Sequence, residues 1–403
     1  MALNHDELLK KVNPIYFSAK GCLILLAETG DPDLVNFCNG VDTEQLTAAA
    51  TAQDPQITRG RIISLDVRYN MWNVLAEETD CQTIVDLPCG YLPHCLTAAR
   101  LKKNYYGFDL PIVTDEISSV ASKFMTDREK NFVHYHGVDA TNYFSMRNAL
   151  RGVEGKICII TDGLLGYFNR NDLKAVCENV NRLLREFGGC WYTSDSQFTD
   201  LMAITYAALT GGGREEMLAA NDSGRRQVAD SEDENIFSAG TLEERRRFME
   251  ACGFSVKSFR YPEKLRVIPS LKDEPALMNQ LLSAYGEIEE WVLTAEETNA
   301  AERIDLPFAQ KFSVSDGVLS VQLRGRLDTI TAPKLLEEYE ACREKFSFAE
   351  IKIDASELSY VSYAGLRAFR IMCEALEDSR RFKILNAGDD LKKSLAADFL
   401  DAI

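Results

Sequence analysis

The chain has 403 residues, 46% of them hydrophobic and 27% charged, which is typical of a globular protein with two or three domains. With 45 Lys and Arg against 62 Asp and Glu, its formal net charge is −17. Because cations bind phosphate backbones and anionic lipids, this acidity argues against nucleic-acid and membrane partners. No run of about 18 apolar residues could span a bilayer. The N-terminus also lacks the layout of a signal peptide, so we expect a cytoplasmic protein.

Eleven cysteines are scattered along the chain without a CxxC pair. In an intracellular protein such cysteines mostly act as small buried apolar residues. His134 and His136 form an HxH pair, but zinc sites need three or four ligands and no companions stand at a suitable spacing. No metal site is predicted.

The predicted elements begin with strands and helices that alternate between residues 81 and 195. Five strand candidates lie at 83–87, 104–110, 131–138, 156–162 and 190–195. Segments with helical periodicity, such as 116–130 and 172–187, separate them. Apolar strands that alternate with amphipathic helices predict a parallel, doubly wound α/β sheet. Residues 254–261 and 289–296 add two strands, which gives a seven-stranded Rossmann-like sheet.

Two breaks in composition divide the chain. Residues 211–240 are rich in Gly, Asp and Glu and predict a long loop, either a cover over a substrate or a disordered segment. Residues 294–307 are polar and end in proline, which is typical of a linker. Strands and helices beyond the linker predict a small α/β domain. We therefore predict domains at 1–298, with an N-terminal helical extension, and at 306–403.

Four acidic residues stand at the carboxyl ends of predicted strands: Asp86, Asp109, Asp139 and Asp162. Ligands of open parallel sheets bind outside these ends. Gly90 lies in the tight turn after the first strand, where a glycine lets the backbone approach a ligand closely. Asp109 is placed to accept hydrogen bonds from a ribose diol, and Asp139 to reach the exocyclic amine of an adenine. The alternative role of each acid is to cap a helix or turn.

Residues from about 10 to 298 resemble the class I S-adenosylmethionine (SAM) methyltransferases, specifically the leucine carboxyl methyltransferase-like group. The resemblance rests on four segments: TRGRIISLDVR (58–68), IVDLPCG (84–90), GFDLP (107–111) and TDGLLGYF (161–168). It implies an O-methyltransferase that uses SAM and a carboxylate or hydroxyl acceptor.

The resemblance also implies a set of cofactor-binding residues: Arg68, Asp86, Gly90, Asp109, Asp139 and Asp162. Arg68 would pair with the carboxylate of SAM, or else lie on an exposed helix face. Asp162 and Tyr167 would stand near the methionine end and the substrate as the catalytic residues. Pro88 occupies the site of the motif's usual first glycine, and proline removes a backbone donor. A scaffold that no longer uses the cofactor is therefore an alternative.

Residues 323–335 and 351–370 resemble the STAS domain of anti-sigma-factor antagonists, and the likeness covers about 306–403. It implies a domain that binds partner proteins through the loop before its second long helix. That loop consists of Ser362, Tyr363, Ala364 and Gly365. Regulated members carry a phosphorylated serine where this chain has Ala364. Ser362 is a nearby substitute, and its alternative role is the helix N-cap.

These observations leave two classes of function open. The first is a SAM-dependent O-methyltransferase whose STAS domain supplies protein contacts, such as substrate docking or a homodimer. The second is a partner-switching regulator whose methyltransferase-like domain senses a ligand or is a non-catalytic scaffold. For an enzyme, a carboxylate acceptor is favoured, because it needs no general base and only His94 stands beside the predicted cofactor turn.

Overall fold

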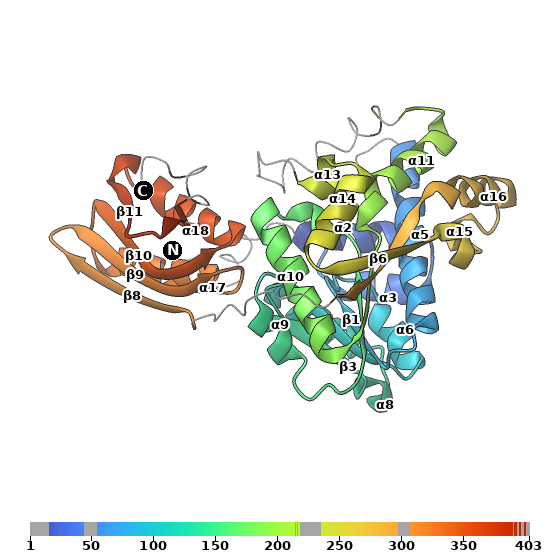
Figure 1. The fold of residues 1–403 in the computed structure, drawn as a ribbon, viewed down its shortest axis with the longest axis horizontal. Helices are drawn as coiled ribbons and strands as arrows, with labels where there is room; N and C mark the ends of the chain where they lie inside the picture. The colour runs from blue at the N-terminus through green and yellow to red at the C-terminus, as the bar shows by residue number, and fades with distance from the viewer. Residues whose placement is uncertain are drawn as a thin grey trace. The chain divides into compact units, whose positions relative to one another are not determined.

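The structure is a computed structural model that describes residues 16–43, 55–213, 215, 217, 235–296, 307–389, 391, 392, 395 and 399 (Figure 1). The chain divides into two compact units, one of residues 15–298 and one that contains residues 299–403. Each unit has its own sheet and its own hydrophobic core. Among the described helices, none combines the length and the hydropathy that a bilayer-spanning segment requires.

The larger unit is built on a seven-stranded sheet. Its strands are β1 (Thr83–Asp86), β2 (Asn104–Asp109), β3 (Val133–Gly137), β4 (Ile157–Thr161), β5 (Gly189–Thr193), β6 (Phe254–Arg260) and β7 (Glu289–Ala295). Their order across the sheet is β3-β2-β1-β4-β5-β7-β6. The first five strands are parallel, and β7 runs antiparallel to both β5 and β6. The expected Rossmann-like α/β sheet is confirmed.

Helices cover both faces of this sheet, which is why its central strands are apolar throughout. Alternate residues of a strand point to opposite faces, so Ile84 and Val85 belong to different core clusters. The cluster around Ile84 includes residues of α2 (Tyr16–Ala27), α3 (Pro32–Gly40), α5 (Pro55–Glu78), α6 (His94–Arg100), α7 (Pro111–Ala121), α11 (Phe198–Thr210), α15 (Tyr261–Lys264) and α16 (Pro275–Ala284). The cluster around Val85 includes residues of α9 (Tyr143–Ala149), α10 (Arg170–Phe187), α13 (Ile236–Ala239) and α14 (Leu242–Ala251).

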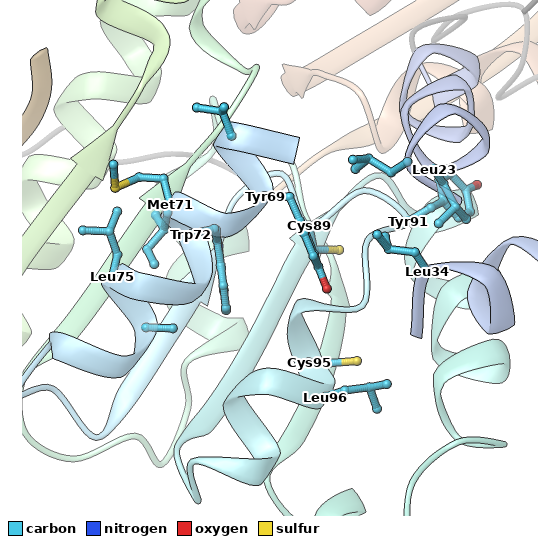
Figure 2. Close-up of a cluster of buried hydrophobic side chains, with 14 of the residues drawn as sticks. Leu23, Leu34, Tyr69, Met71, Trp72, Leu75, Cys89, Tyr91, Cys95 and Leu96 are labelled. Atoms are coloured by element: carbon cyan, nitrogen blue, oxygen red, sulfur yellow. The ribbon is translucent and has the colours of Figure 1, made fainter. Parts of the chain in front are cut away.

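Figure 2 shows part of the first cluster, where Trp72 of α5 lies near the turn that follows β1. Leu23 and Leu34 bring α2 and α3 into the same cluster. Cys89 and Cys95 are buried in it as well. All eleven cysteines are free and seven are buried. This confirms the expectation that most of them serve as small apolar residues.

The chain order places a crevice at the end of β1. From β1 the chain moves outward to β2 and β3, and then returns to β4 on the other side of β1. Open α/β sheets bind ligands outside the carboxyl ends of the strands at such a switch point. The candidate site therefore lies where β1, β2 and β4 end.

The second unit is a four-stranded sheet with two long helices. Its elements are β8 (Ala309–Ser315), β9 (Val318–Leu327), α17 (Thr331–Lys345), β10 (Glu350–Val361), α18 (Tyr363–Glu374) and β11 (Phe382–Leu385), and the sheet order is β11-β10-β9-β8. The expected small α/β unit is confirmed. Strand β8 was not predicted, because as an edge strand it alternates between exposed and half-buried positions and lacks an apolar run.

Two predicted segments lie largely outside the described residues. Of the loop predicted over 211–240, the structure describes mainly α13 and its flanks. Of the linker predicted over 294–307, it describes the end of β7 and residue 307.

Candidate active site at the carboxyl edge of the sheet

The turn after β1 is tied to the end of β2. Gly90 has a φ of +51°, a left-handed conformation that favours glycine. Its N–H donates a hydrogen bond of 2.8 Å to Asp109 Oδ2, and the Cys89 N–H donates to the Phe108 carbonyl at 2.9 Å. The structure thus brings Gly90 and Asp109, both predicted site residues, into direct contact.

Asp109 is a half-buried carboxylate held by backbone donors. Its second oxygen, Oδ1, accepts the Leu110 N–H at 2.7 Å. Burial raises the pKa of Asp109 to about 6, against the two backbone hydrogen bonds, and the charge of Asp86 raises it further. An ionised carboxylate has about four lone-pair sites. Two sites remain after these bonds, enough for the two hydroxyls of a diol.

Arg68 of α5 forms an ion pair with Asp162, which directly follows β4. Arg68 Nε and Nη2 lie 2.6 and 2.5 Å from Asp162 Oδ1. The Ser194 hydroxyl donates to the same oxygen at 2.6 Å. Within the described part of the chain, no hydrogen bond reaches Oδ2. The Asp162 side chain is 20% exposed, so Oδ2 remains available to a ligand.

Asp86 lies beneath the turn rather than at its surface. Its carboxylate is 2% exposed and accepts hydrogen bonds from Trp72 Nε1 at 3.0 Å and from the Tyr105 hydroxyl at 2.7 Å. His94 Nδ1 lies 3.0 Å from the same carboxylate, and its ring stacks on Trp72. Three protein groups thus occupy Asp86. Its contact with a cofactor stays a prediction that these hydrogen bonds do not support.

Asp139 closes the turn after β3. It is 2% exposed, and Oδ1 accepts the N–H of Thr141 at 2.7 Å and its hydroxyl at 2.6 Å. This is the turn-capping role that the sequence left open as an alternative. The structure does not bring Asp139 together with the Arg68–Asp162 pair by any described hydrogen bond, and its contact with an adenine stays a prediction.

A residue that the sequence analysis missed orders the loop after β4. Asp195, 4% exposed, accepts the backbone N–H groups of Gly163, Leu164 and Leu165 at 2.6, 2.8 and 2.7 Å. Asp195 stands at the end of the predicted strand 190–195, as the four singled-out acids stand at theirs. That signal was sufficient to find it.

Helix α2, which the sequence analysis also left without a role, borders the site. The Ser18 hydroxyl lies 3.4 Å from the hydroxyl of Tyr167, a predicted catalytic residue that is 39% exposed. Ala19 Cβ would be 3.6 Å from a Cβ placed on Gly90. Burial raises the pKa of the Cys22 thiol, on which Arg68 and Asp162 also act. One helix therefore reaches both the glycine turn and the end of β4.

The predicted partner-binding loop of the second unit begins helix α18. Ser362 is 3% exposed, and its hydroxyl accepts the Gly365 N–H at 3.4 Å, which confirms its role as N-cap. Ala364 is buried as well. A Cβ on Gly365 would lie 2.7 Å from the Leu327 carbonyl oxygen, so the position has no room for a side chain. The Arg367 guanidinium lies 4.8 Å from the ring centre of Tyr363, which is half-buried.

Comparison with known proteins identifies one part of the chain by family. Residues 310–401 match the STAS domain family, so the chain contains a STAS domain. No curated protein is similar in sequence to this chain.

Solved structures resemble the larger part of the chain at low sequence identity. A DUF574 family protein from Streptomyces avermitilis is 12% identical, with a TM-score of 0.40 over 70% of this chain and 97% of that one. An O-methyltransferase family protein from Burkholderia thailandensis is 13% identical, with a TM-score of 0.33 over 69% and 73%. Human N-acetylserotonin methyltransferase, solved with SAM, is 13% identical, with a TM-score of 0.31 over 69% and 67%. The activity of this chain is therefore argued from its own residues.

Proposed function

We propose that residues 1–298 form a SAM-dependent O-methyltransferase and that the STAS domain supplies its protein contacts. One observation carries the proposal. At the switch point of the sheet, a glycine turn bonded to Asp109 adjoins strand β4, where Arg68 pairs with Asp162 and leaves one carboxylate oxygen free.

The donors and acceptors of this site fit the two polar ends of SAM. Asp109 retains acceptor sites for the ribose hydroxyls after its two backbone bonds. Asp162 Oδ2 can accept the ammonium group of the methionine part, and the remaining N–H groups of Arg68 can donate to its carboxylate. Pro88 offers no backbone donor, so Gly90 and the acidic side chains carry the fit. When bound, SAM supplies a methyl group that is already activated.

The protein's part in the reaction is positioning. Methyl transfer requires the acceptor oxygen to lie in line with the bond that breaks, and holding two reactants in this geometry accounts for most of such catalysis. Tyr167 and Ser18, on opposite sides of their 3.4 Å contact, border the space beside Asp162 in which an acceptor would bind. His94 is buried and stacked against Trp72, so it is not a general base for this site. This favours a carboxylate acceptor, which needs no base.

Calorimetric titration of the full chain with SAM tests the proposal. We expect one molecule of SAM to bind per chain, and the Arg68→Met variant to bind it more weakly by about 1.5–3 kcal/mol, the worth of a hydrogen bond to a charged group. Lys174→Met, on an exposed helix position, is the matched control. Transfer of a labelled methyl group to small carboxylic acids or to proteins in a cell extract then tests the reaction. Absence of binding would contradict the proposal.

The STAS domain supports a second candidate, a partner-switching regulator whose methyltransferase-like unit senses a nucleoside ligand. Ala364 leaves no hydroxyl immediately before Gly365, and the Ser362 hydroxyl is buried as an N-cap. We therefore expect mass spectrometry of protein from its native cell to find residues 360–367 unmodified, and partner binding to be constitutive. Stoichiometric phosphate on Ser362, or SAM binding without any methyl transfer, would favour the regulator.

A further inference from the structure

A buried carboxyl group lies within electrostatic reach of the Arg68–Asp162 pair. Glu290 belongs to β7, is 1% exposed, and its Oε2 atom has no hydrogen-bond partner within the described residues. Its chain neighbours Glu289 and Trp291 lie on the opposite face of the strand, where Arg246 contacts both. An unpaired buried oxygen is costly, and native structures retain few of them.

The groups that act on Glu290 come from four elements of the unit. Burial raises the pKa of Glu290 well above its usual range, and the negative charge of Asp162 raises it further. A hydrogen bond from Tyr261 at the start of α15 lowers it, the charge of Asp195 raises it, and Arg68 of α5 lowers it. Arg68 is the cation that acts most strongly on this carboxyl, and it is already bound to Asp162.

We propose that Glu290 is a positioning residue that keeps Arg68 on Asp162, and that it acts as an uncharged acid. The inference rests on the proposed function, in which that pair binds the methionine end of SAM. A neutral carboxyl does not compete with Asp162 for the guanidinium. An ionised Glu290 would compete, because its Oε2 has no donor and a buried charge needs a partner. Arg68 would then be drawn away from Asp162 and from the ligand.

The first experiment needs no ligand. The Nε–H resonance of Arg68 in the nitrogen NMR spectrum reports its hydrogen bond to Asp162, and we would follow it in the full chain from about pH 6 to 9.5. In the wild type we expect it to move as pH rises and Glu290 loses its proton. In Glu290→Gln, which mimics the neutral acid, it should stay at its low-pH position throughout. Glu289→Gln, on the opposite face of the same strand, should behave as the wild type does.

The second experiment is titration with SAM over the same pH range. We expect the wild-type affinity to fall about tenfold for each pH unit above the pKa of Glu290, in step with the Arg68 resonance. Glu290→Gln should bind SAM with an affinity that does not follow this fall. Glu290→Ala, which removes the group altogether, should bind more weakly than Glu290→Gln at every pH.

The outcomes separate this inference from the proposed function. If Glu290→Gln shows the same pH response as the wild type, or if the Arg68 resonance never moves, the role of Glu290 is overturned. If the resonance moves only in proteins that retain Glu290 but none of them binds SAM, the proposed function fails while Glu290 still holds the pair. Should Glu290→Ala not fold, the comparison between the wild type and Glu290→Gln decides alone.

Discussion

At the scale of single residues, the predicted acids turn out to do different work. Asp109 and Asp162 keep lone pairs for a ligand, whereas the three hydrogen-bonding groups around Asp86 occupy it fully. All are aspartates at strand ends. Their neighbours distinguish them, because a carboxylate surrounded by buried donors is a structural group and a half-buried one can still accept.

Binding of SAM should depend on the ionisation of Asp109. Its pKa of about 6 means that the carboxylate, the form that accepts two hydroxyls, is lost as pH falls through 6. We therefore expect the dissociation constant for SAM to rise below about pH 6 in the wild type, measured by calorimetry. Asp109→Asn should bind roughly 100-fold more weakly and show no such pH dependence, since two hydrogen bonds to a charged group are weakened.

The same pKa shift predicts the sign of a stability change. Asp109 holds its proton more tightly in the folded than in the unfolded protein, so stability is lost as pH rises from about 4 to 6. Compared with Asp109→Asn, the wild type should lose free energy of unfolding over that interval. A wild type that gains stability there would contradict the burial of this carboxyl.

Replacing Asp86 should damage the fold before it damages binding. Asp86→Ala would leave Trp72 Nε1, the Tyr105 hydroxyl and His94 Nδ1 buried without their acceptor. We expect a loss of about 3–5 kcal/mol in the free energy of unfolding, measured in urea. Asp80→Ala, at an exposed carboxylate whose ion pair with Lys156 spans 3.8 Å, should cost less than about 1 kcal/mol.

At the scale of elements, helix α2 is fastened to the site by one buried cation. Lys20 Nζ donates to Glu116 Oε1 of α7 at 2.9 Å and to the Asp42 carbonyl at 3.0 Å. The Tyr91 hydroxyl, from the turn after β1, donates to Glu116 Oε2 at 2.9 Å. Three segments that border the site are therefore joined at Glu116.

Removing this cation should loosen α2. In Lys20→Met, Glu116 loses its charged partner, so we expect amide hydrogen exchange in residues 18–27 to accelerate and SAM to bind several-fold more weakly. Lys174→Met, which breaks an exposed pair with Glu178, should change neither. Unchanged exchange in α2 of Lys20→Met would mean that apolar packing alone holds the helix.

At the scale of the whole molecule, the two units have separate cores, so each should fold alone. We predict that residues 1–298 and 306–403 each express as folded proteins with cooperative thermal unfolding. Limited proteolysis of the full chain should cut first near residue 300 or within 211–240, where the sequence is polar and lacks large apolar residues. A first cut between 320 and 390 would contradict this division.

The sequence by itself determined the elements and their class. Period-two and helical patterns are local, so all seven strands of the first sheet and the long helices of the second unit could be predicted, as could the acids at strand ends. The edge strand β8 could not, because a half-exposed strand carries little apolar signal.

Only the tertiary structure decided what each candidate side chain does. Arg68 and Asp162 are 94 residues apart in sequence, Ser18 and Tyr167 are 149 apart, and Glu290 acquires its environment from four elements. Such partners are set by how helices pack on the sheet, which no local pattern records. Whether a strand-end carboxylate is consumed by buried donors, as in Asp86, or keeps an oxygen for a ligand, as in Asp162, follows from that packing.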